Sequence, residues 1–324
     1  MTLAQFIREM PKVELHVHME GAIQPETVLK LAARNHIALP ADSVEGLRAW
    51  YSFTDFPHFV QIYVKISECL QTADDIEFMA REFLKGQAAQ NIRYSEVTYT
   101  PYTHYMQKGL AFAEQLAALN RARAWAEAEL GVTMRLITDI SRNVTPEQGM
   151  VTAQWAVSAK DDGVAALGLG GPEVGHPAEK HAAAFEYAWS HGLPCILHAG
   201  ETDGAPSIWG AIKHGRTLRI GHGVRCLEDR ALVDYLREKQ IPLEVSPSSN
   251  VCLKVFPSLG EHALPKLMAE GLYVTLNSDD PPMFNTTLTD EYLRCADAFG
   301  WNADLIEKLV FDALREVSLL PEKA

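Results

Sequence analysis

The feature that most constrains the fold is the regular alternation of short β-rich runs with longer helical segments along the chain. Eight runs are expected to be strands: Val13–His18, Arg93–Thr100, Thr133–Ile140, Val164–Leu169, Pro194–His198, Leu218–His222, Pro242–Val245 and Tyr273–Asn277. Segments with helical periodicity lie between them, and several end at a glycine, which is a common helix stop signal. Such a repeated alternation predicts a parallel β/α architecture.

A closed (β/α)8 TIM barrel fits the length of 324 residues, because such barrels usually need about 250 residues plus insertions. A doubly wound open sheet is the alternative. It usually has a glycine-rich phosphate turn after its first strand, whereas this first strand ends in His16-Val17-His18. The longest insertion, residues 24–67, is rich in aromatic side chains. We therefore expect residues 1–324 to form a single barrel domain with an extra helical lid after the first strand.

The charge balance argues against nucleic acid as a partner. The chain has 42 acidic and 29 basic residues, a net charge of −13, and no Lys/Arg-rich block that could neutralise phosphates. Its five cysteines form no CxxC pair, so a reducing cytoplasm is the expected location. Because neither a signal peptide nor a membrane-spanning apolar run is evident, we expect no membrane partner. A small polar substrate fits this composition, and the oligomeric state, including a homo-oligomer, stays open.

Polar residues recur at the carboxyl ends of the predicted strands, where barrel enzymes place their catalytic groups. His16 and His18 lie two residues apart on a strand, so both imidazoles face one side and suit metal ligation. Two histidines stacked on a half-buried strand are the alternative. His198 ends the fifth strand and, taken alone, could be a core histidine. Glu201 follows it in a loop, where a carboxylate could exchange protons with a bound molecule or cap a helix.

Two further strand ends complete this set. His222 lies between two glycines and could be a base, a ligand or an ordinary turn residue. Asp279 and Asp280 follow the last strand; adjacent carboxylates avoid dry sites unless a cation offsets their charge, although this run is also good turn chemistry. Together the histidines and a carboxylate form a ligand set suited to Zn²⁺, with Ni²⁺, Fe²⁺ or Co²⁺ as competitors. Such a site would activate a water molecule.

At these residues the chain resembles the adenosine/AMP/adenine deaminase branch of the amidohydrolase superfamily. The matching segments are PKVELHVHMEGA (11–22), LGLGGPE (167–173), LHAGE (197–201), RIGHG (219–223), SPSSN (246–250) and LNSDDP (276–281). HAGE and SDDP behind an HxH strand form the most specific part of the pattern. The resemblance implies a zinc enzyme with one ion per chain that hydrolyses the 6-amino group of a purine and releases ammonia.

The resemblance also implies which residues carry out the reaction. It assigns the zinc ligands to His16, His18, His198 and Asp279. His222 would orient the attacking water and assist its deprotonation. Glu201 would donate a proton to N1 of the purine as the attack takes place at C6. Because Glu201 must be protonated for this role, we expect its pKa to be raised when substrate excludes water.

The remaining implied roles concern substrate binding. Asp280 would accept a hydrogen bond from N7 of the purine, and the backbone of Gly171 would contact N3. The aromatic insertion, with Phe56, Phe59 and Tyr63, would cover the base as a lid. Plain core packing is the alternative for some of these rings.

The chain departs from the family pattern where the substituent at N9 is expected to bind. Glu20-Gly21 stands where adenosine deaminases usually have Asp-Gly, near the ribose 5′ end, and a glutamate here also resembles adenine deaminases. The loop Thr98–His104, which includes Thr100, and the SPSSN segment differ as well. Our leading hypothesis is the deamination of adenosine or 2′-deoxyadenosine to an inosine-type product. Adenine, or a modified nucleoside such as aminodeoxyfutalosine, is the alternative substrate.

Three other classes of protein fit the sequence less well. His18-Met19-Glu20 matches half of the cytidine-deaminase signature, but the required P-C-x-x-C half is missing. An amide or phosphoester hydrolase on the same barrel commonly uses two metal ions bridged by a carboxylated lysine, and the segment 164–171 contains no lysine. A non-catalytic binding protein should have lost part of the metal or acid set, yet every member is present.

Overall fold

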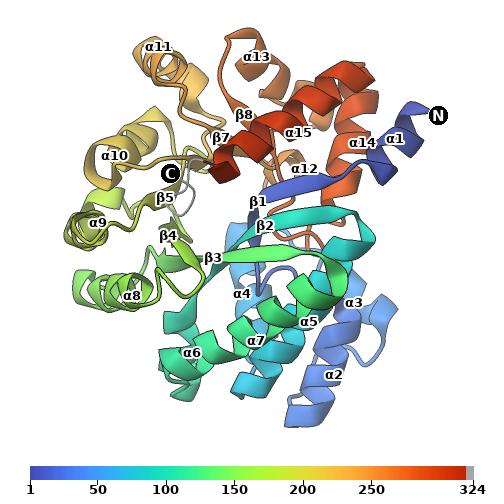
Figure 1. Ribbon diagram of the computed structural model, residues 1–324, viewed down its shortest axis with the longest axis vertical. Coiled ribbons are helices and arrows are strands. Elements are labelled where there is room, and N and C mark those ends of the chain that lie inside the picture. Colours follow the sequence, from blue (N-terminus) through green and yellow to red (C-terminus); the bar gives the residue numbers. More distant parts are fainter. Residues whose placement is uncertain (319–324) are drawn as a thin grey trace.

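Eight parallel strands form the barrel that the sequence predicts, and helices cover its outside (Figure 1). The computed structural model describes residues 1–318. The strands follow one another around the sheet in chain order: β1 (Lys12–His18), β2 (Ile92–Tyr99), β3 (Thr133–Ser141), β4 (Val164–Gly170), β5 (Cys195–Ala199), β6 (Ile220–His222), β7 (Leu243–Val245) and β8 (Val274–Leu276). Each strand pairs in parallel with the next one.

The ring of strands closes where the residues after β8 meet the end of β1. Val17 forms an isolated parallel bridge with Asp279. The His18 amide donates to the Asp279 carbonyl at 2.9 Å, and the Asp279 amide donates to the His16 carbonyl at 3.1 Å. The contacts that close the barrel therefore also bring Asp279 beside the two histidines of β1.

Helices connect successive strands. Those between β1 and β2 are α2 (Pro25–Asn35), α3 (Val44–Trp50), α4 (Phe56–Ser67) and α5 (Ala73–Ala89). The others, in chain order, are α1 (Leu3–Glu9), α6 (Pro101–Lys108), α7 (Phe112–Leu130), α8 (Pro146–Ser158), α9 (Ala182–Ser190), α10 (Ala205–Gly215), α11 (Arg230–Lys239), α12 (Pro247–Cys252), α13 (Leu264–Ala269), α14 (Leu288–Phe299) and α15 (Ala303–Ser318). Within residues 1–318, no helix combines the length and the apolar character that crossing a membrane requires.

The long insertion after β1 is helical, as the sequence predicts. α4 begins at Phe56, where the Asp55 side chain accepts a hydrogen bond from the His58 amide at 2.9 Å and caps the helix. The rings of Phe59 and Phe284 stack with their centroids 5.6 Å apart and an interplanar angle of 14°. This contact holds α4 against the segment that follows β8. Its role as a lid remains a prediction.

Two glycines on β4 leave room inside the barrel for an acidic side chain of β3. A Cβ atom at Gly168 would lie 2.7 Å from Asp139 Oδ1, and one at Gly170 would lie 2.9 Å from Asp139 Oδ2. Cβ atoms in proteins essentially never come this close to another heavy atom. The glycine-rich run of β4 therefore permits a carboxylate at the carboxyl end of the barrel.

Candidate active site

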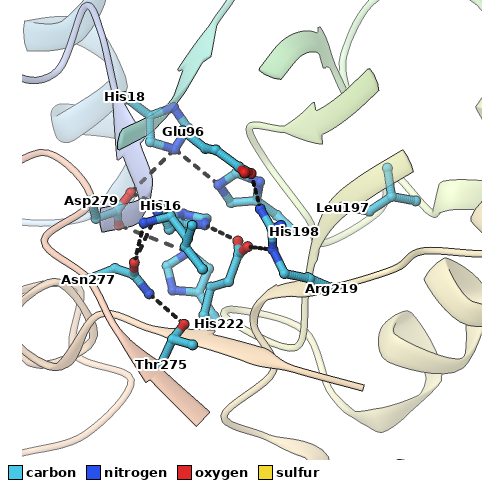
Figure 2. Close-up of polar contacts among 12 residues, drawn as sticks. His16, His18, Glu96, Leu197, His198, Arg219, His222, Thr275, Asn277 and Asp279 are labelled. Carbon is cyan, nitrogen blue, oxygen red and sulfur yellow. Dashed lines mark hydrogen bonds and ion pairs between the residues drawn. The ribbon is translucent and has the colours of Figure 1, made fainter. Parts of the chain in front are cut away.

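A cluster of side chains that could hold a metal ion lies where three strands end (Figure 2). One ligand atom from each member lies within 4.8 Å of the others, and the members are His16, His18, His198 and Asp279. His18 Nε2 is 3.0 Å from His198 Nε2 and 3.3 Å from Asp279 Oδ1. His16 Nε2 is 3.5 Å from the same carboxylate oxygen. The structure thus brings together the four residues that the resemblance implies as ligands.

The spacing of this cluster is close to that of the ligands around a bound metal ion. Zinc bonds of about 2.0–2.2 Å to nitrogen and oxygen place tetrahedral ligand atoms roughly 3.3–3.6 Å apart. The three separations above are 3.0, 3.3 and 3.5 Å. In addition, His16 Nε2 is buried and has no hydrogen-bond partner among the described residues, a costly state that a bound cation would relieve.

A chain of buried charged groups fixes the orientation of the His16 ring. His16 Nδ1 lies 2.9 Å from Glu244 Oε2, and Arg219 Nε donates to Glu244 Oε1 at 2.5 Å. Arg219 also pairs with Glu96, and all three charged side chains are buried. Because a carboxylate beside Nδ1 keeps the proton on that nitrogen, the lone pair of Nε2 points into the cluster.

Contacts from the residue directly after β8 and from α12 hold other members of the cluster. Asn277 Oδ1 accepts hydrogen bonds from the amides of Leu15 and His16 at 2.9 and 3.0 Å. The Ser249 hydroxyl donates to Asp279 Oδ2 at 2.7 Å. Asp279 itself has a φ of 65°, a left-handed conformation that is uncommon outside glycine. Strained backbone of this kind concentrates at functional sites, where surrounding contacts enforce it.

His222 lies beside this cluster of four residues but is not one of them. Its Nε2 is 3.6 Å from Glu201 Oε1 and 3.9 Å from Asp279 Oδ2. Its Nδ1 is 3.3 Å from the side-chain nitrogen of Asn250. Burial lowers the pKa of His222 to about 3, even though the charge of Asp279 acts in the opposite direction. The imidazole is therefore neutral and can form a hydrogen bond with a water molecule in front of it.

The loop after β5 carries Glu201 and is organised by Glu173. The Glu173 carboxylate accepts hydrogen bonds from four consecutive amides, those of Gly200 (2.5 Å), Glu201 (3.1 Å), Thr202 (2.8 Å) and Asp203 (2.9 Å). The cap of α10 is Gly204, so Glu201 does not cap that helix. Burial, followed by the charges of Asp279 and Glu173, raises the pKa of Glu201 well above its usual range. A protonated carboxyl group is thus available as a proton donor.

The Asp280 side chain lies against Gly21, where any larger residue would clash with it. A Cβ atom at Gly21 would lie 1.5 Å from Asp280 Oδ1. This oxygen is buried and has no hydrogen-bond partner within residues 1–318. Burial, followed by the charge of Asp279, raises the pKa of Asp280 well above its usual range. The site therefore contains a second protonated carboxyl group next to Asp279.

A cavity of about 520 Å³ opens over these side chains, which is within the usual range for small-molecule sites. All the predicted substrate-binding residues line it: Gly171, Asp280, Glu20, Phe56, Phe59 and Thr100. Its inner end is formed by His18, His198, Asp279, His222 and Glu201. His16 lies beneath this end and lines a smaller space inside the barrel.

Glu20 contacts the protein more extensively than the sequence indicates. Its Oε1 accepts a hydrogen bond from the Thr100 amide at 3.2 Å and lies 3.0 Å from His104 Nε2. Its Oε2 accepts a hydrogen bond from the Tyr63 hydroxyl at 3.1 Å. Although burial acts in the other direction, His104 above all, and then the Thr100 amide, lower the pKa of Glu20. Glu20 therefore connects α4, through Tyr63, and α6, through His104, to the end of β1.

Asp139 is a cavity residue that the sequence analysis missed. It lies near the end of β3, its side chain lines the cavity, and the residue is 3 % exposed. Its Oδ1 has no hydrogen-bond partner among the described residues. An acid at the end of a predicted strand, opposite glycines of the next strand, is the signal that could have identified it. Glu173 was likewise missed, because its contacts are with a loop far along the chain.

Comparison with known proteins matches residues 11–324 to the family model for adenosine deaminase. Among curated relatives, an aminodeoxyfutalosine deaminase of Streptomyces avermitilis is 37 % identical over 296 residues, which cover 91 % of this chain and 82 % of that protein.

Two solved structures have a closely similar fold. An adenine deaminase from Arthrobacter aurescens superposes with a TM-score of 0.90 at 34 % identity, covering 94 % of this chain and 93 % of that one. An amidohydrolase from Burkholderia ambifaria with bound Zn superposes with a TM-score of 0.90 at 25 % identity, covering 97 % of this chain and 88 % of the other.

Proposed function

The chain belongs to the adenosine deaminase family of hydrolases, which act on C–N bonds of cyclic amidines, and we propose that its substrate is a 6-aminopurine nucleoside, adenosine or 2′-deoxyadenosine. Water would replace the 6-amino group, leaving a 6-oxopurine and ammonia. The observation that carries this proposal is the convergence of a metal-ligand cluster with Glu201 and His222 at the inner end of one cavity.

We assign one Zn²⁺ to the cluster, held by His16, His18, His198 and Asp279. A bound zinc ion would lower the pKa of a coordinated water toward about 7, which makes a nucleophile available at neutral pH. The bound Zn in the amidohydrolase from Burkholderia ambifaria supports this choice of metal. The chain's own contribution is to hold these ligands in place through Glu244, Asn277 and Ser249.

Acid–base roles follow from the protonation states of the side chains. Glu201, whose raised pKa keeps it protonated, donates its proton to N1 of the purine, which draws electrons away from C6. Neutral His222 orients the attacking water. His222 would take one proton of the attacking water and pass it to the amino group, and the Glu201 carboxylate would regain its proton from the new hydroxyl group at C6. Ammonia then leaves, N1 keeps its proton and a carbonyl forms at C6.

Asp280 would bind N7 with the hydrogen-bond direction opposite to the one that the resemblance suggested. N7 of a 6-aminopurine carries a lone pair and no proton, so it can only accept a hydrogen bond. The raised pKa of Asp280 supplies the required proton. Its unpartnered Oδ1 and the nearby wall at Gly171 leave space for the edge of a purine ring.

The size of the cavity supports a nucleoside as the first candidate. Its volume of about 520 Å³ leaves room beyond the ten non-hydrogen atoms of adenine for a substituent at N9. Free adenine is the second candidate, supported by the adenine deaminase from Arthrobacter aurescens and by Glu20. Aminodeoxyfutalosine is the modified nucleoside to compare with both.

Deamination assays of the purified, zinc-loaded protein test the proposal. The panel is adenine, adenosine, 2′-deoxyadenosine and aminodeoxyfutalosine, with ammonia release and the ultraviolet change measured together and a chelator-treated control for each compound. We expect the nucleosides to react with the highest kcat/KM and chelation to stop the reaction. A higher kcat/KM for adenine than for the nucleosides would identify the free base as the substrate. No reaction with any compound, despite stoichiometric zinc, would refute a purine substrate.

A further inference from the structure

Arg142, the residue directly after β3, has one of the largest fully buried side chains of the protein. Its guanidinium donates from Nη2 to the His198 carbonyl and from Nη1 to the His176 carbonyl, at 2.5 Å in each case. Both acceptors are backbone oxygens rather than carboxylates. A buried guanidinium is costly unless hydrogen bonds satisfy it. The two backbone segments that Arg142 joins therefore hold this side chain, and it holds them in turn.

The first of these segments is the end of β5, which carries His198. The carbonyls of Cys195 and Ala199 accept hydrogen bonds from residues that flank β6. Because successive carbonyls along a strand alternate in direction, the His198 carbonyl points the other way, toward β4. The pairing between β4 and β5 ends one residue earlier, at Leu197. Arg142 therefore supplies a donor for this carbonyl where the pairing of the two strands has ended.

The second segment is the loop after β4. The His176 amide donates to the Glu173 carbonyl at 3.0 Å, so these two residues belong to one turn of this loop. The Glu173 side chain in turn accepts hydrogen bonds from the four amides of the loop that carries Glu201. By holding the His176 carbonyl, Arg142 also fixes the turn from which Glu173 reaches Glu201.

We propose that Arg142 is a positioning residue for the reaction, because it ties the strand end that carries His198 to the turn that holds the Glu201 loop. The inference rests on the proposed function, in which His198 binds the metal ion and Glu201 donates the proton. These two residues are three positions apart, and Arg142 holds the backbone directly at the first and, through Glu173, at the second. Without Arg142 the two groups would shift relative to each other, and a misplacement of about 1 Å can cost about 100-fold in rate.

The positive charge of Arg142 is a second property, which has to be separated from its two hydrogen bonds. Burial lowers the pKa of Arg142, whereas the charges of four carboxyl groups, led by Glu173, act in the opposite direction. Arg142→Lys keeps the charge, but a single ammonium nitrogen cannot reproduce the two donors of the guanidinium fork. Arg142→Met removes both properties. The lysine variant is the more conservative of the two and carries the test if the methionine variant does not fold.

Zinc affinity, measured by competition with a chromophoric chelator, is the first test, because it does not depend on a substrate. We expect Arg142→Lys and Arg142→Met to bind zinc about 10–100-fold more weakly than the wild type, as is usual when a partner of a metal ligand is lost. The absorption spectrum of the Co²⁺-loaded protein, which depends on ligand geometry, should change in the same variants. A zinc affinity of Arg142→Lys within about threefold of the wild type would overturn the proposal.

Steady-state kinetics at saturating zinc provide the second test, with the purine that the wild type deaminates best. Arg142 does not line the cavity, so we expect kcat of Arg142→Lys to fall about 100-fold while KM changes less than about threefold. A rise in KM with unchanged kcat would overturn the proposal. If the wild type binds zinc but deaminates no purine, the proposed function fails, and the zinc affinities still decide the role of Arg142.

Arg123 offers a matched control at the opposite end of the barrel. It also joins two backbone segments, because Nε donates to the Met134 carbonyl at 2.7 Å and Nη1 donates to the Asp162 carbonyl at 3.4 Å. Arg123 lies outside the cavity lining, so we expect Arg123→Lys to keep zinc affinity and kcat within about twofold of the wild type. Thermal unfolding measures the loss of stability in both lysine variants. An equal loss of zinc affinity in Arg123→Lys and Arg142→Lys would show general destabilisation and overturn the proposal.

Discussion

The inner and outer ends of the cavity differ in how their side chains are held. At the inner end, strand termini carry the functional groups, and buried partners such as Glu244, Asn277 and Glu173 fix each one. At the outer end, side chains such as Gln107 and Asn143 lie on a helix and a loop and are exposed. The inner side chains therefore have positions that several buried contacts fix, whereas the outer side chains can vary without disturbing them.

Removing a metal ligand should have the largest effect. We expect Asp279→Ala to lose bound zinc and all measurable deamination, since one of the four proposed ligands disappears and the buried histidines lose their negative partner. Metal content by atomic emission and activity in the same sample provide the measurement. Ala128→Lys, at an exposed position on α7, is the control for zinc that is lost during purification. Full zinc occupancy in Asp279→Ala would show that Asp279 is not a ligand.

Removing the proton donor should leave the metal and nearly abolish turnover. Glu201→Gln keeps the shape of the side chain but cannot transfer a proton, so we expect kcat to fall about 10²–10⁴-fold with zinc content unchanged. Steady-state kinetics on the zinc-loaded variant test this expectation. Retention of more than a tenth of the wild-type kcat would mean that another group supplies the proton.

Neutralising Glu173 should have an intermediate effect and shift the pH profile. Glu201 must be protonated to act, so activity falls as the pH rises through its pKa. The charge of Glu173 helps to raise that pKa, and Glu173→Gln should therefore move the falling alkaline limb to lower pH. We also expect kcat to decrease about tenfold, because an amide has one acceptor oxygen for the four loop amides. If the alkaline limb of the pH–activity profile does not move, the role of Glu173 is structural only.

Changing the outer end should have the smallest effect on the chemistry. Gln107→Ala removes an exposed side chain from α6, so we expect KM for a nucleoside to rise about two- to fivefold with kcat unchanged. The free energy of unfolding should stay within about 0.5 kcal/mol of the wild type. Kinetics and urea unfolding measure the two quantities. A tenfold fall in kcat would show that the outer end of the cavity also contributes to the chemical step.

The local part of the site could be predicted from the sequence. The eight strands and the polar residues at their ends are adjacent along the chain, so strand periodicity places them at one end of the barrel. His16 and His18 share a strand face, and His198 precedes Glu201 by three residues. The family resemblance then supplied the roles of these residues and the purine.

The strand–helix alternation, the barrel and the residues at the strand ends can be predicted from the amino-acid sequence, because each depends on neighbours along the chain. The side chains that support these residues are known only from the folded protein. Asp139 depends on glycines of the next strand, Glu20 contacts His104, and Glu173 reaches the loop at Glu201. These contacts join residues between 27 and 84 positions apart, and the register between strands and the packing of loops, rather than any local pattern, bring them together.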